Sequence, residues 1–218
     1  MPTLKFEKDL WSRGLLRVVG VDEVGMAALA GPVVAAAVMV QPDTKLIRAV
    51  KDSKMLTRQQ REELVPLIRE RVVRVGVGAA SVSEIHRLNI YHASHVAMTR
   101  ALRQIGEYDW VLVDGRRILD PAFAPGRHTE IVKGDTKSFA IAAASIVAKV
   151  TRDRLMASLA RKYPGYGWEH NAGYPSIDHR TALHDLGLTP LHRHDFGTVK
   201  YMRAVENQLS LALTEAPS

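Results

Sequence analysis

The sequence has no cysteine and no long hydrophobic run, and each absence excludes a class of protein. Without cysteine the chain has no disulfides, no thiolate metal ligands and no cysteine nucleophile. The longest apolar run, residues 26–40, is too short to cross a bilayer and contains Gly31 and Pro32. The first residues, MPTLKFEKDLW, place acids where a signal peptide needs an apolar core. We therefore expect a soluble, cytoplasmic protein with no membrane association.

The composition is that of a globular chain with a basic surface. The 218 residues are enough for one domain with a small appendage, and 46% of them are hydrophobic while 24% are charged. Thirty Lys and Arg against 23 Asp and Glu give a net charge of +7. Basic side chains gain free energy by releasing counterions from a phosphate backbone, so a polyanionic partner is one interpretation. The alternative is that these residues only keep the surface soluble.

The most informative stretch is residues 18–40, VVGVDEVGMAALAGPVVAAAVMV. Two adjacent acids, Asp22 and Glu23, stand inside an otherwise apolar run, where a charge must be paired, bound to a metal or open to water. The β-branched residues before them favour a strand, and the run after Pro32 reads as a second strand buried on both faces. We predict a hairpin whose first strand ends in a carboxylate pair. An acidic strand end that faces solvent is the alternative interpretation.

Two further acids follow short apolar strands. Asp114 closes the strand predicted at residues 110–113, and Asp135 follows a short strand at residues 131–132. In sheets with helical crossovers the carboxyl ends of strands are where sites are built. An Asp-Gly turn and the capping of a helix over residues 137–162 are the structural alternatives. We assign Asp153, well inside that helix, to structure.

Several neighbouring segments have simpler interpretations. Residues 51–54, KDSK, are predicted to form a turn that binds a phosphate, and the alternative is a solvated turn capped by Asp52 or Ser53. We predict that a helix follows from Thr57 to about residue 71, with a kink at Pro66. A strand follows residue 72; then Ser83 caps one helical turn and a longer helix spans residues 90–105. The histidines of that region fit no metal motif, so we interpret them as packed or surface residues.

Four acids at strand ends in separate parts of one α/β chain have a chemical reason to converge. Hard divalent ions such as Mg²⁺ prefer oxygen ligands, and two such ions can activate water and stabilise a leaving oxygen in phosphodiester hydrolysis. A basic surface would hold the polyanion. The acids and the charge therefore point to the same class of substrate.

The motifs together resemble type 2 ribonuclease H, the ribonuclease HII family of bacteria. The matching pieces are GVDEVG with LAGPVVAAAV, then DSK, VLVDG, KGDTKS with AAASIVAKVTRDRLM, and finally YPGYGW, NAGYPS and HR, over residues 18–196. The resemblance implies a ribonuclease H-like α/β fold with a mixed five-stranded central sheet flanked by helices. It also implies a catalytic domain at residues 1–162 and a helical substrate-binding extension at residues 163–218.

The resemblance implies an activity and a set of site residues. The activity is metal-dependent cleavage of RNA paired with DNA, and of duplex DNA 5′ of a single embedded ribonucleotide, leaving 3′-hydroxyl and 5′-phosphate ends. The cofactors would be two Mg²⁺ or Mn²⁺ ions, held by the catalytic acids Asp22, Glu23, Asp114 and Asp135. Substrate contacts carried over by the same resemblance are Ser53, Lys54, Lys137, Ser138 and the junction-sensing Tyr174.

One motif departs from the family pattern. The family usually has Gly-Arg-Gly-Pro after DEV, with a backbone that reads the ribose 2′-hydroxyl and an arginine that grips a phosphate; here the residues are Gly25, Met26, Ala27 and Ala28. Methionine cannot pair with a phosphate, and a Cβ at Ala27 can crowd the backbone or forbid a positive φ. Backbone amides still serve if the local conformation survives. We hypothesise that metal binding persists while discrimination for a lone ribonucleotide is weakened or altered.

The C-terminal part adds a possible partner. We predict a helix from Ser176 to about residue 186, ended by Gly187, and a last helix over residues 198–213. We interpret the histidine-rich segment around it as surface or as contacts to a nucleic-acid backbone. The hexapeptide QLSLAL resembles the peptide with which bacterial replication proteins dock on the sliding clamp, and the alternative is an amphipathic helix packed on its own domain. Its anchor residues are Gln208, Leu209, Leu211 and Leu213.

Two rival functions stay open. One is a ribonuclease H-like DNA endonuclease, and the other is a non-catalytic duplex-binding module. Full retention of four mutually repelling acids argues against the second. We expect the protein to act as a monomer on a nucleic-acid duplex.

Overall fold

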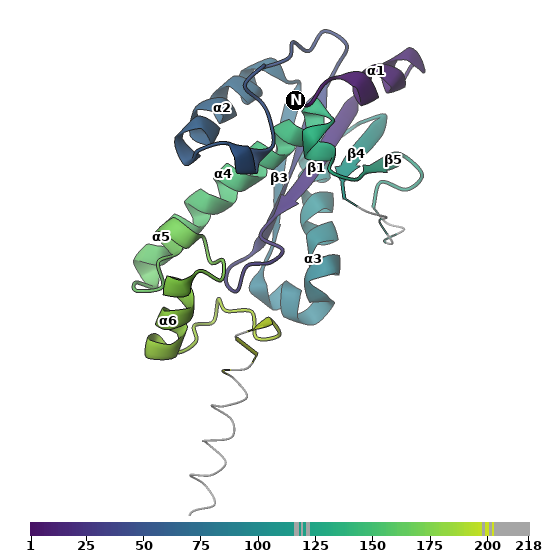
Figure 1. The fold of residues 1–218 in the computed structure, drawn as a ribbon. Coiled ribbons are helices and arrows are strands. Elements are labelled where there is room, and N and C mark those ends of the chain that lie inside the picture. Colours follow the sequence, from purple (N-terminus) through teal and green to yellow (C-terminus); the bar gives the residue numbers. More distant parts are fainter. Residues whose placement is uncertain (116–117, 119, 121–122, 198, 201, 203–218) are drawn as a thin grey trace, which may run out of the picture.

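One mixed β-sheet forms the centre of the molecule (Figure 1). The computed structural model describes residues 1–115, 118, 120, 123–197, 199–200 and 202. In this part of the chain the five strands have the order β3-β2-β1-β4-β5. β1 is antiparallel to β2 and parallel to β4, β2 is antiparallel to β3, and β4 is parallel to β5. The strands are β1 (Val18–Val24), β2 (Val33–Val40), β3 (Arg74–Ala80), β4 (Trp110–Asp114) and β5 (His128–Ile131).

β2 lies at the middle of the core, as its sequence predicts. All eight of its residues are buried. Because successive side chains of a strand point to opposite faces, Ala36, Val38 and Val40 join one hydrophobic cluster while Ala35, Ala37 and Met39 join another. The predicted hairpin and the mixed five-stranded sheet are both confirmed.

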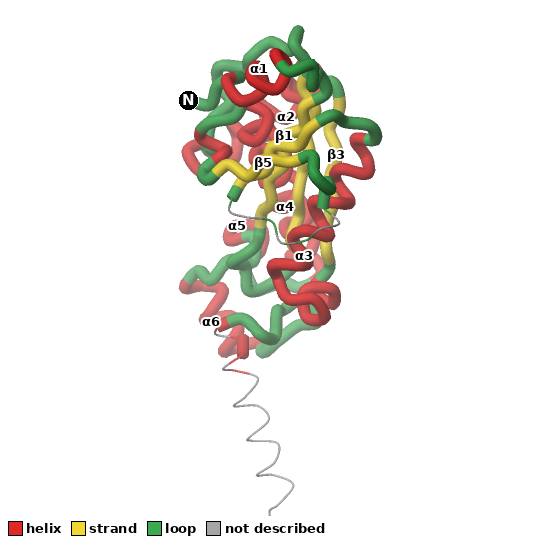
Figure 2. Tube along the Cα trace, turned by 90° about the vertical axis from the view of Figure 1, so that its right-hand side faces the viewer, coloured by secondary structure: helices red, strands yellow, loops and turns green. Residues whose placement is uncertain are grey.

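Helices cover both faces of this sheet (Figures 1 and 2). On one face the central helix α4 packs on the strands with α2 and α1 around it, and α3 covers the other face. A Cβ on Gly20 of β1 would lie 2.2 Å from the backbone carbonyl carbon of Ala140, so only glycine admits α4 at this distance. The helices are α1 (Lys5–Ser12), α2 (Arg58–Arg71), α3 (Val82–Ile105), α4 (Phe139–Lys162), α5 (Trp168–Asn171) and α6 (Ile177–Leu186).

The helix ends show where local sequence rules succeed and fail. Thr57 caps α2 in a capping box with Gln60, as predicted, and the helix continues through Pro66. The predicted cap at Ser83 is wrong: Ser81 caps α3, because Glu84 three residues later reaches back to it. Asn89, with a φ of 64°, interrupts α3 between the two predicted segments. Ser176 and Gly187 bound α6 as predicted.

The C-terminal part packs against the sheet-bearing part through a third hydrophobic cluster. Trp168 and Leu183 are fully buried in it, together with Met156 of α4 and Ala30 of the β1–β2 loop. The division at residue 162 stays a prediction. The predicted helix over residues 198–213 lies outside the described residues apart from 199, 200 and 202, and the four clamp-motif residues lie outside them entirely. Across the described residues, no helix is both long enough and apolar enough to span a membrane.

Candidate active site

Strand register brings the predicted acids to one edge of the sheet. Val21 of β1 pairs with Val113 of the parallel strand β4, so Asp22 and Asp114 are the next residues on neighbouring strands. Asp114 in turn pairs with Ile131 at the end of β5, and η2 (Gly134–Thr136), a 3₁₀ turn, follows and carries Asp135. The backbone N–H of Gly134 donates to Oδ1 of Asp114 at 2.6 Å, which ties this turn to β4.

The acids border a cleft of about 480 Å³. Asp22, Glu23 and Asp114 line it together with the segment 24–27, and so do residues far along the chain, namely Ser53, Lys54, Ser145, Lys149 and Tyr174. Asp135 is buried beside it and is close enough to Asp114 for the two charges to repel. The structure therefore brings the four predicted acids to one place.

Burial and mutual repulsion make these carboxylates hard to ionise. Burial raises the pKa of Asp22 well above its usual range, and the charges of Glu23 and Asp114 raise it further. Burial and Asp114 likewise raise the pKa of Glu23 to about 7. The pKa of Asp135 is raised for the same reasons, while Lys54 opposes the rise. Too little positive charge lies near the four carboxylates to offset their mutual repulsion, and a bound cation would offset it.

The donor set suits a hard divalent cation. All four acids offer carboxylate oxygens, and among the described residues that line the cleft there is neither a histidine nor a cysteine. Within the described residues, no group of three Asp, Glu or His side chains is arranged to hold a metal ion. The chemistry of the donors fits such an ion.

Two hydrogen-bonded hydroxyl groups support Asp22. Ser145 of α4 hydrogen-bonds to the Asp22 carboxylate and lowers its pKa, against the larger effect of burial. The Ser145 hydroxyl also lies 2.8 Å from that of Ser53 in η1 (Ser53–Met55), another 3₁₀ turn. Ser53 is thus a cleft residue whose hydroxyl is already engaged, and Lys54 is the member of the predicted pair whose charge reaches the acids.

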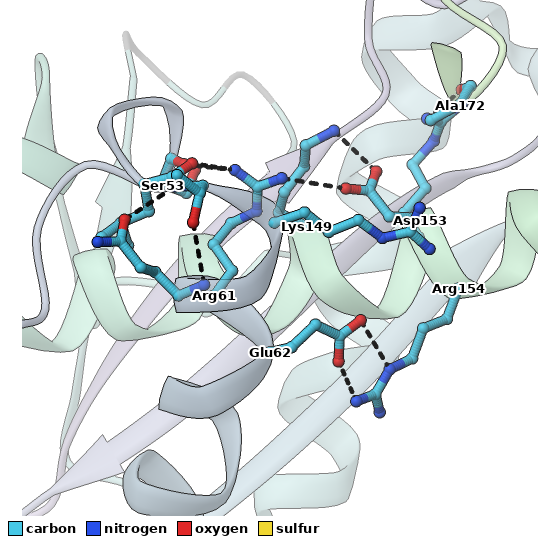
Figure 3. Close-up of polar contacts among 12 residues, drawn as sticks. Ser53, Arg61, Glu62, Lys149, Asp153, Arg154 and Ala172 are labelled. Atoms are coloured by element: carbon cyan, nitrogen blue, oxygen red, sulfur yellow. Dashed lines mark hydrogen bonds and ion pairs between the residues drawn. The ribbon is translucent and has the colours of Figure 1, made fainter. Parts of the chain in front are cut away.

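The turn that presents Ser53 and Lys54 is anchored to α4 by Arg61 (Figure 3). The Arg61 guanidinium donates to the carbonyl oxygen of Ser53 at 3.0 Å and lies 3.5 Å from a carboxylate oxygen of Asp153. Lys149 pairs with the same carboxylate at 2.7 Å. Asp153 therefore has the structural role that the sequence assigned to it.

Ser138 has a structural role in place of the predicted substrate contact. Its side chain is fully buried, accepts from the backbone N–H of Ile141 as the N-cap of α4, and donates to Glu7 at 2.6 Å. Asp135 does not cap α4. The neighbouring Lys137 is exposed, and its Nζ donates to the carbonyl oxygen of Val132 at 2.7 Å.

Tyr174 lines the same cleft as Asp22, Glu23 and Asp114. Lys149 Nζ and the guanidinium carbon of Arg152 each lie 5.3 Å from the centre of its ring, within the range of a cation–π contact. Its carbonyl oxygen lies 2.9 Å from Nδ1 of His179. A half-buried ring held in this way presents a flat apolar surface to whatever occupies the cleft.

The segment that differs from the family motif, residues 25–27, has a positive φ at one position only. Gly25 has a φ of +95°, whereas neither Met26 nor Ala27 has a positive φ. The Cβ of Ala27 is therefore compatible with the backbone here. Met26 is partly buried against the hydrophobic cluster beneath α3, and both residues line the cleft.

Two of the C-terminal histidines are not where the sequence placed them, whereas His170 and His184 are exposed as predicted. His179 and His192 are fully buried rather than exposed to solvent or nucleic acid. Their Nε2 atoms lie 3.2 Å apart, and Trp168 donates to Nε2 of His179 at 3.0 Å. The reason is the apolar pocket of the third cluster, in which paired histidines satisfy one another and their backbone neighbours.

Sequence reasoning missed Ser145 and Lys149 as cleft residues. Both lie on α4, four residues apart, and therefore on the same helix face. The available signal was a serine and a lysine at this spacing within the otherwise apolar run FAIAAASIVAKV.

The fold and the site together define a class: a ribonuclease H-like α/β protein with a carboxylate centre at the carboxyl ends of its central strands. The family model described as Ribonuclease HII matches residues 19–199. A relative in Thermosynechococcus vestitus, named Ribonuclease HII, is 50% identical over 194 residues, which cover 89% of this chain and 90% of the relative. The chain therefore belongs to the ribonuclease HII family and is a type 2 ribonuclease H enzyme.

Solved structures agree with this assignment. The crystal structure of ribonuclease H2 from Pyrococcus horikoshii superposes with a TM-score of 0.73 at 26% identity, covering 88% of this chain and all of that one. The RNase HII of Archaeoglobus fulgidus, in a structure of its complex with PCNA, superposes with a TM-score of 0.71 at 26% identity, covering 84% of this chain and 96% of that one.

Proposed function

We propose that the cleft hydrolyses phosphodiester bonds on the RNA side of RNA/DNA hybrids and 5′ of ribonucleotides embedded in duplex DNA, leaving 3′-hydroxyl and 5′-phosphate ends. The observation that carries this proposal is the meeting of Asp22, Glu23, Asp114 and Asp135 at one sheet edge, beside a cleft that Tyr174 also lines. The family match supports the class of substrate.

We propose that these four acids hold two divalent ions, Mg²⁺ or Mn²⁺. Such ions supply Lewis-acid stabilisation of the developing phosphate charge and lower the pKa of a bound water. Lys54, Lys137 and Lys149 contribute positive charge along the path of a nucleic-acid backbone. Tyr174 offers its ring to the sugar that follows the ribonucleotide.

We propose that the segment 25–27 recognises the ribose through its backbone. The amide N–H groups of Met26 and Ala27 take part in no hydrogen bond within the described residues, and both residues line the cleft. A donor N–H can bind the 2′-hydroxyl that distinguishes RNA from DNA. With Met26 in place of an arginine, this segment lacks a side chain to pair with a phosphate.

The test is a cleavage assay on three duplexes of one sequence: DNA with a single ribonucleotide, an RNA/DNA hybrid, and DNA alone. The proposal predicts Mg²⁺- or Mn²⁺-dependent cleavage of the first two only, and a loss of about 100-fold or more for Asp135→Asn. Cleavage of the duplex of DNA alone would favour the DNA endonuclease, and binding without cleavage would favour the duplex-binding module.

We also propose docking on the replication clamp through Gln208 and Leu211, with the protein acting as a monomer in the cytoplasm. The support is the motif itself and the PCNA complex of the Archaeoglobus relative. A pull-down with purified clamp tests the motif: replacement of both residues by alanine should abolish binding, and unchanged binding would overturn this part.

A further inference from the structure

Two arginines are fully buried beneath the cleft, and within the described part of the chain neither one pairs with a carboxylate. Arg152 comes from α4 and Arg193 from the segment after α6. Every hydrogen bond that their guanidinium groups make is donated to a backbone carbonyl oxygen.

This arrangement is energetically expensive. Removing a guanidinium from water costs free energy that a carboxylate partner usually offsets. Burial lowers the pKa of Arg152, and burial together with repulsion from Arg152 lowers the pKa of Arg193 to about 9. Ordinary core packing would be served better by apolar side chains. The contacts that these two arginines make are therefore the place to look for their role.

Five of the six carbonyl oxygens belong to the loop between β1 and β2. Arg193 donates to Gly25 at 2.7 Å, to Met26 at 3.1 Å and to Gly31 at 2.9 Å. Arg152 donates to Ala30 at 3.0 Å and to Pro32 at 2.9 Å, and its sixth acceptor is the carbonyl oxygen of Ala172.

The direction of these carbonyls fixes the direction of the amides that follow them. In a trans peptide, the C=O of one residue and the N–H of the next point opposite ways. The described chain has no cis peptide bond, so the carbonyls of Gly25 and Met26 that face Arg193 turn the N–H groups of Met26 and Ala27 away from it. Neither of these two amides has a hydrogen-bond partner within the described residues, and both residues line the cleft.

The same loop is tied to the segment that carries Tyr174. Leu29 donates its N–H to the carbonyl of Gly173 at 2.8 Å and accepts from the N–H of Arg193 at 2.8 Å. A Cβ on Gly25 would lie 2.2 Å from Nε of Arg152, so the arginine side chain occupies the space that any other residue at position 25 would need.

We propose that Arg193, supported by Arg152, is a positioning residue for ribonucleotide recognition. It holds the carbonyls of residues 25 and 26 inward, and so presents two backbone N–H groups to the sugar hydroxyl of the substrate. This inference rests on the proposed function of the cleft and adds the element that sets its preference for RNA. It also explains how the segment keeps its shape with Met26 and Ala27 in it.

The experiment compares Arg193→Lys and Arg193→Met with the unmodified protein and a matched control. Lysine keeps the charge but offers one nitrogen, which cannot reach carbonyls in three directions. Arg154→Lys is the control, since Arg154 is an exposed arginine of the same helix as Arg152 and pairs only with Glu62 among the described residues (Figure 3). Thermal unfolding selects the variants that fold.

The first measurement is hydrogen–deuterium exchange of the peptide covering residues 25–31, made without substrate. Both Arg193 variants should exchange at least about tenfold faster there, with the control unchanged. The second is the ratio of affinities for DNA with one ribonucleotide and for the all-DNA duplex. This ratio should fall about fivefold or more in Arg193→Lys, mainly because the Kd for the ribonucleotide-containing duplex rises, while the Tm gain on adding Mn²⁺ stays the same.

The outcomes separate the two proposals. Unchanged exchange at residues 25–31, or an unchanged affinity ratio with faster exchange, overturns the positioning role of Arg193. A parallel loss of affinity for both duplexes would show a merely structural role and would overturn it too. If the unmodified protein itself shows no preference for the ribonucleotide, the proposed function fails, and the exchange measurement still decides whether Arg193 holds the loop.

Discussion

At the scale of single residues, the acids of the cleft are placed where they disfavour the metal-free fold. Glu23 illustrates the sign of the effect. Its pKa in the folded protein is about 7, against an ordinary value of 4.5 in the unfolded chain. Between these values the folded state binds more protons than the unfolded state, so the stability contributed at low pH is lost as the pH rises through this range.

Glu23→Gln should therefore remove this pH dependence of the folding stability. Without divalent ions, we expect the variant to melt about 2–5 °C above the unmodified protein at pH 8 and to match it near pH 4.5, because the penalty exists only when Glu23 is charged. Added Mn²⁺ should raise the Tm of the unmodified protein more than that of the variant. Thermal melts from pH 4.5 to 8 measure both effects, and parallel curves would contradict the assignment.

Met26 is the residue at which the chain departs most from its family. Met26→Arg would place a guanidinium at the mouth of the cleft, where a charge-assisted hydrogen bond to a phosphate becomes available. We expect KM for a duplex with one ribonucleotide to fall about 3- to 30-fold at low salt, with little change in kcat. Met26→Gln is the uncharged control. No change in KM would show that the phosphate passes elsewhere.

At the scale of elements, α4 depends on a buried contact with α1. Oε1 of Glu7 accepts from the hydroxyl of Ser138 and from the backbone N–H of Ala140, at the first turn of α4. Burial raises the pKa of Glu7, and its Oε2 has no partner in the described structure. This contact also fixes the chain next to the turn that carries Asp135.

Glu7→Leu should be far more damaging than Glu7→Gln. Leucine leaves two buried donors unsatisfied, which costs about 1–3 kcal/mol each, whereas glutamine still offers an oxygen to both. We expect Glu7→Gln to lie within about 1 kcal/mol of the unmodified protein. Urea unfolding measures the free energies, with Glu63→Leu on the surface of α2 as a control. Equal losses for the two Glu7 variants would refute the contact.

The C-terminal element should respond to acid through its buried histidines. Burial lowers the pKa of His192 to about 4, with the charge of His179 adding to the effect, from an ordinary value of 6.5. Between these values the unfolded chain binds the extra proton, so stability is lost as the pH falls from about 6.5 to 4, by on the order of 3 kcal/mol. His192→Gln should flatten this slope, and exposed His184→Gln should leave it unchanged. A slope as steep in His192→Gln as in the unmodified protein would contradict the assignment.

At the scale of the whole molecule, most of the sheet and all four acids were predictable from sequence. Apolar runs that end in acids mark strands whose carboxyl ends meet, and Asp22 and Asp114 are in neighbouring registers for that reason. The positions of Ser138, His179 and His192 were not predictable, because each is decided by long-range burial. From sequence, Ser138 beside Lys137 is expected to be exposed, whereas in the folded protein its side chain is buried and donates to Glu7 of α1.

The roles of Arg152 and Arg193 show the same limit. In sequence each is a basic residue near other basic residues, and the natural interpretation is contact with nucleic acid. Only the folded chain shows that both side chains point inward to the carbonyls of a loop more than 100 residues away. Charge composition predicted a polyanionic partner, but not which arginines face it.

The most direct test of the account is cleavage of duplex DNA that contains one ribonucleotide, measured with and without Mg²⁺ for the unmodified protein and for Asp114→Asn. We predict a single cut 5′ of the ribonucleotide that requires Mg²⁺ and whose rate falls about 100-fold or more in the variant. A cut that persists in the metal-free reaction, or a variant as active as the unmodified protein, would contradict it.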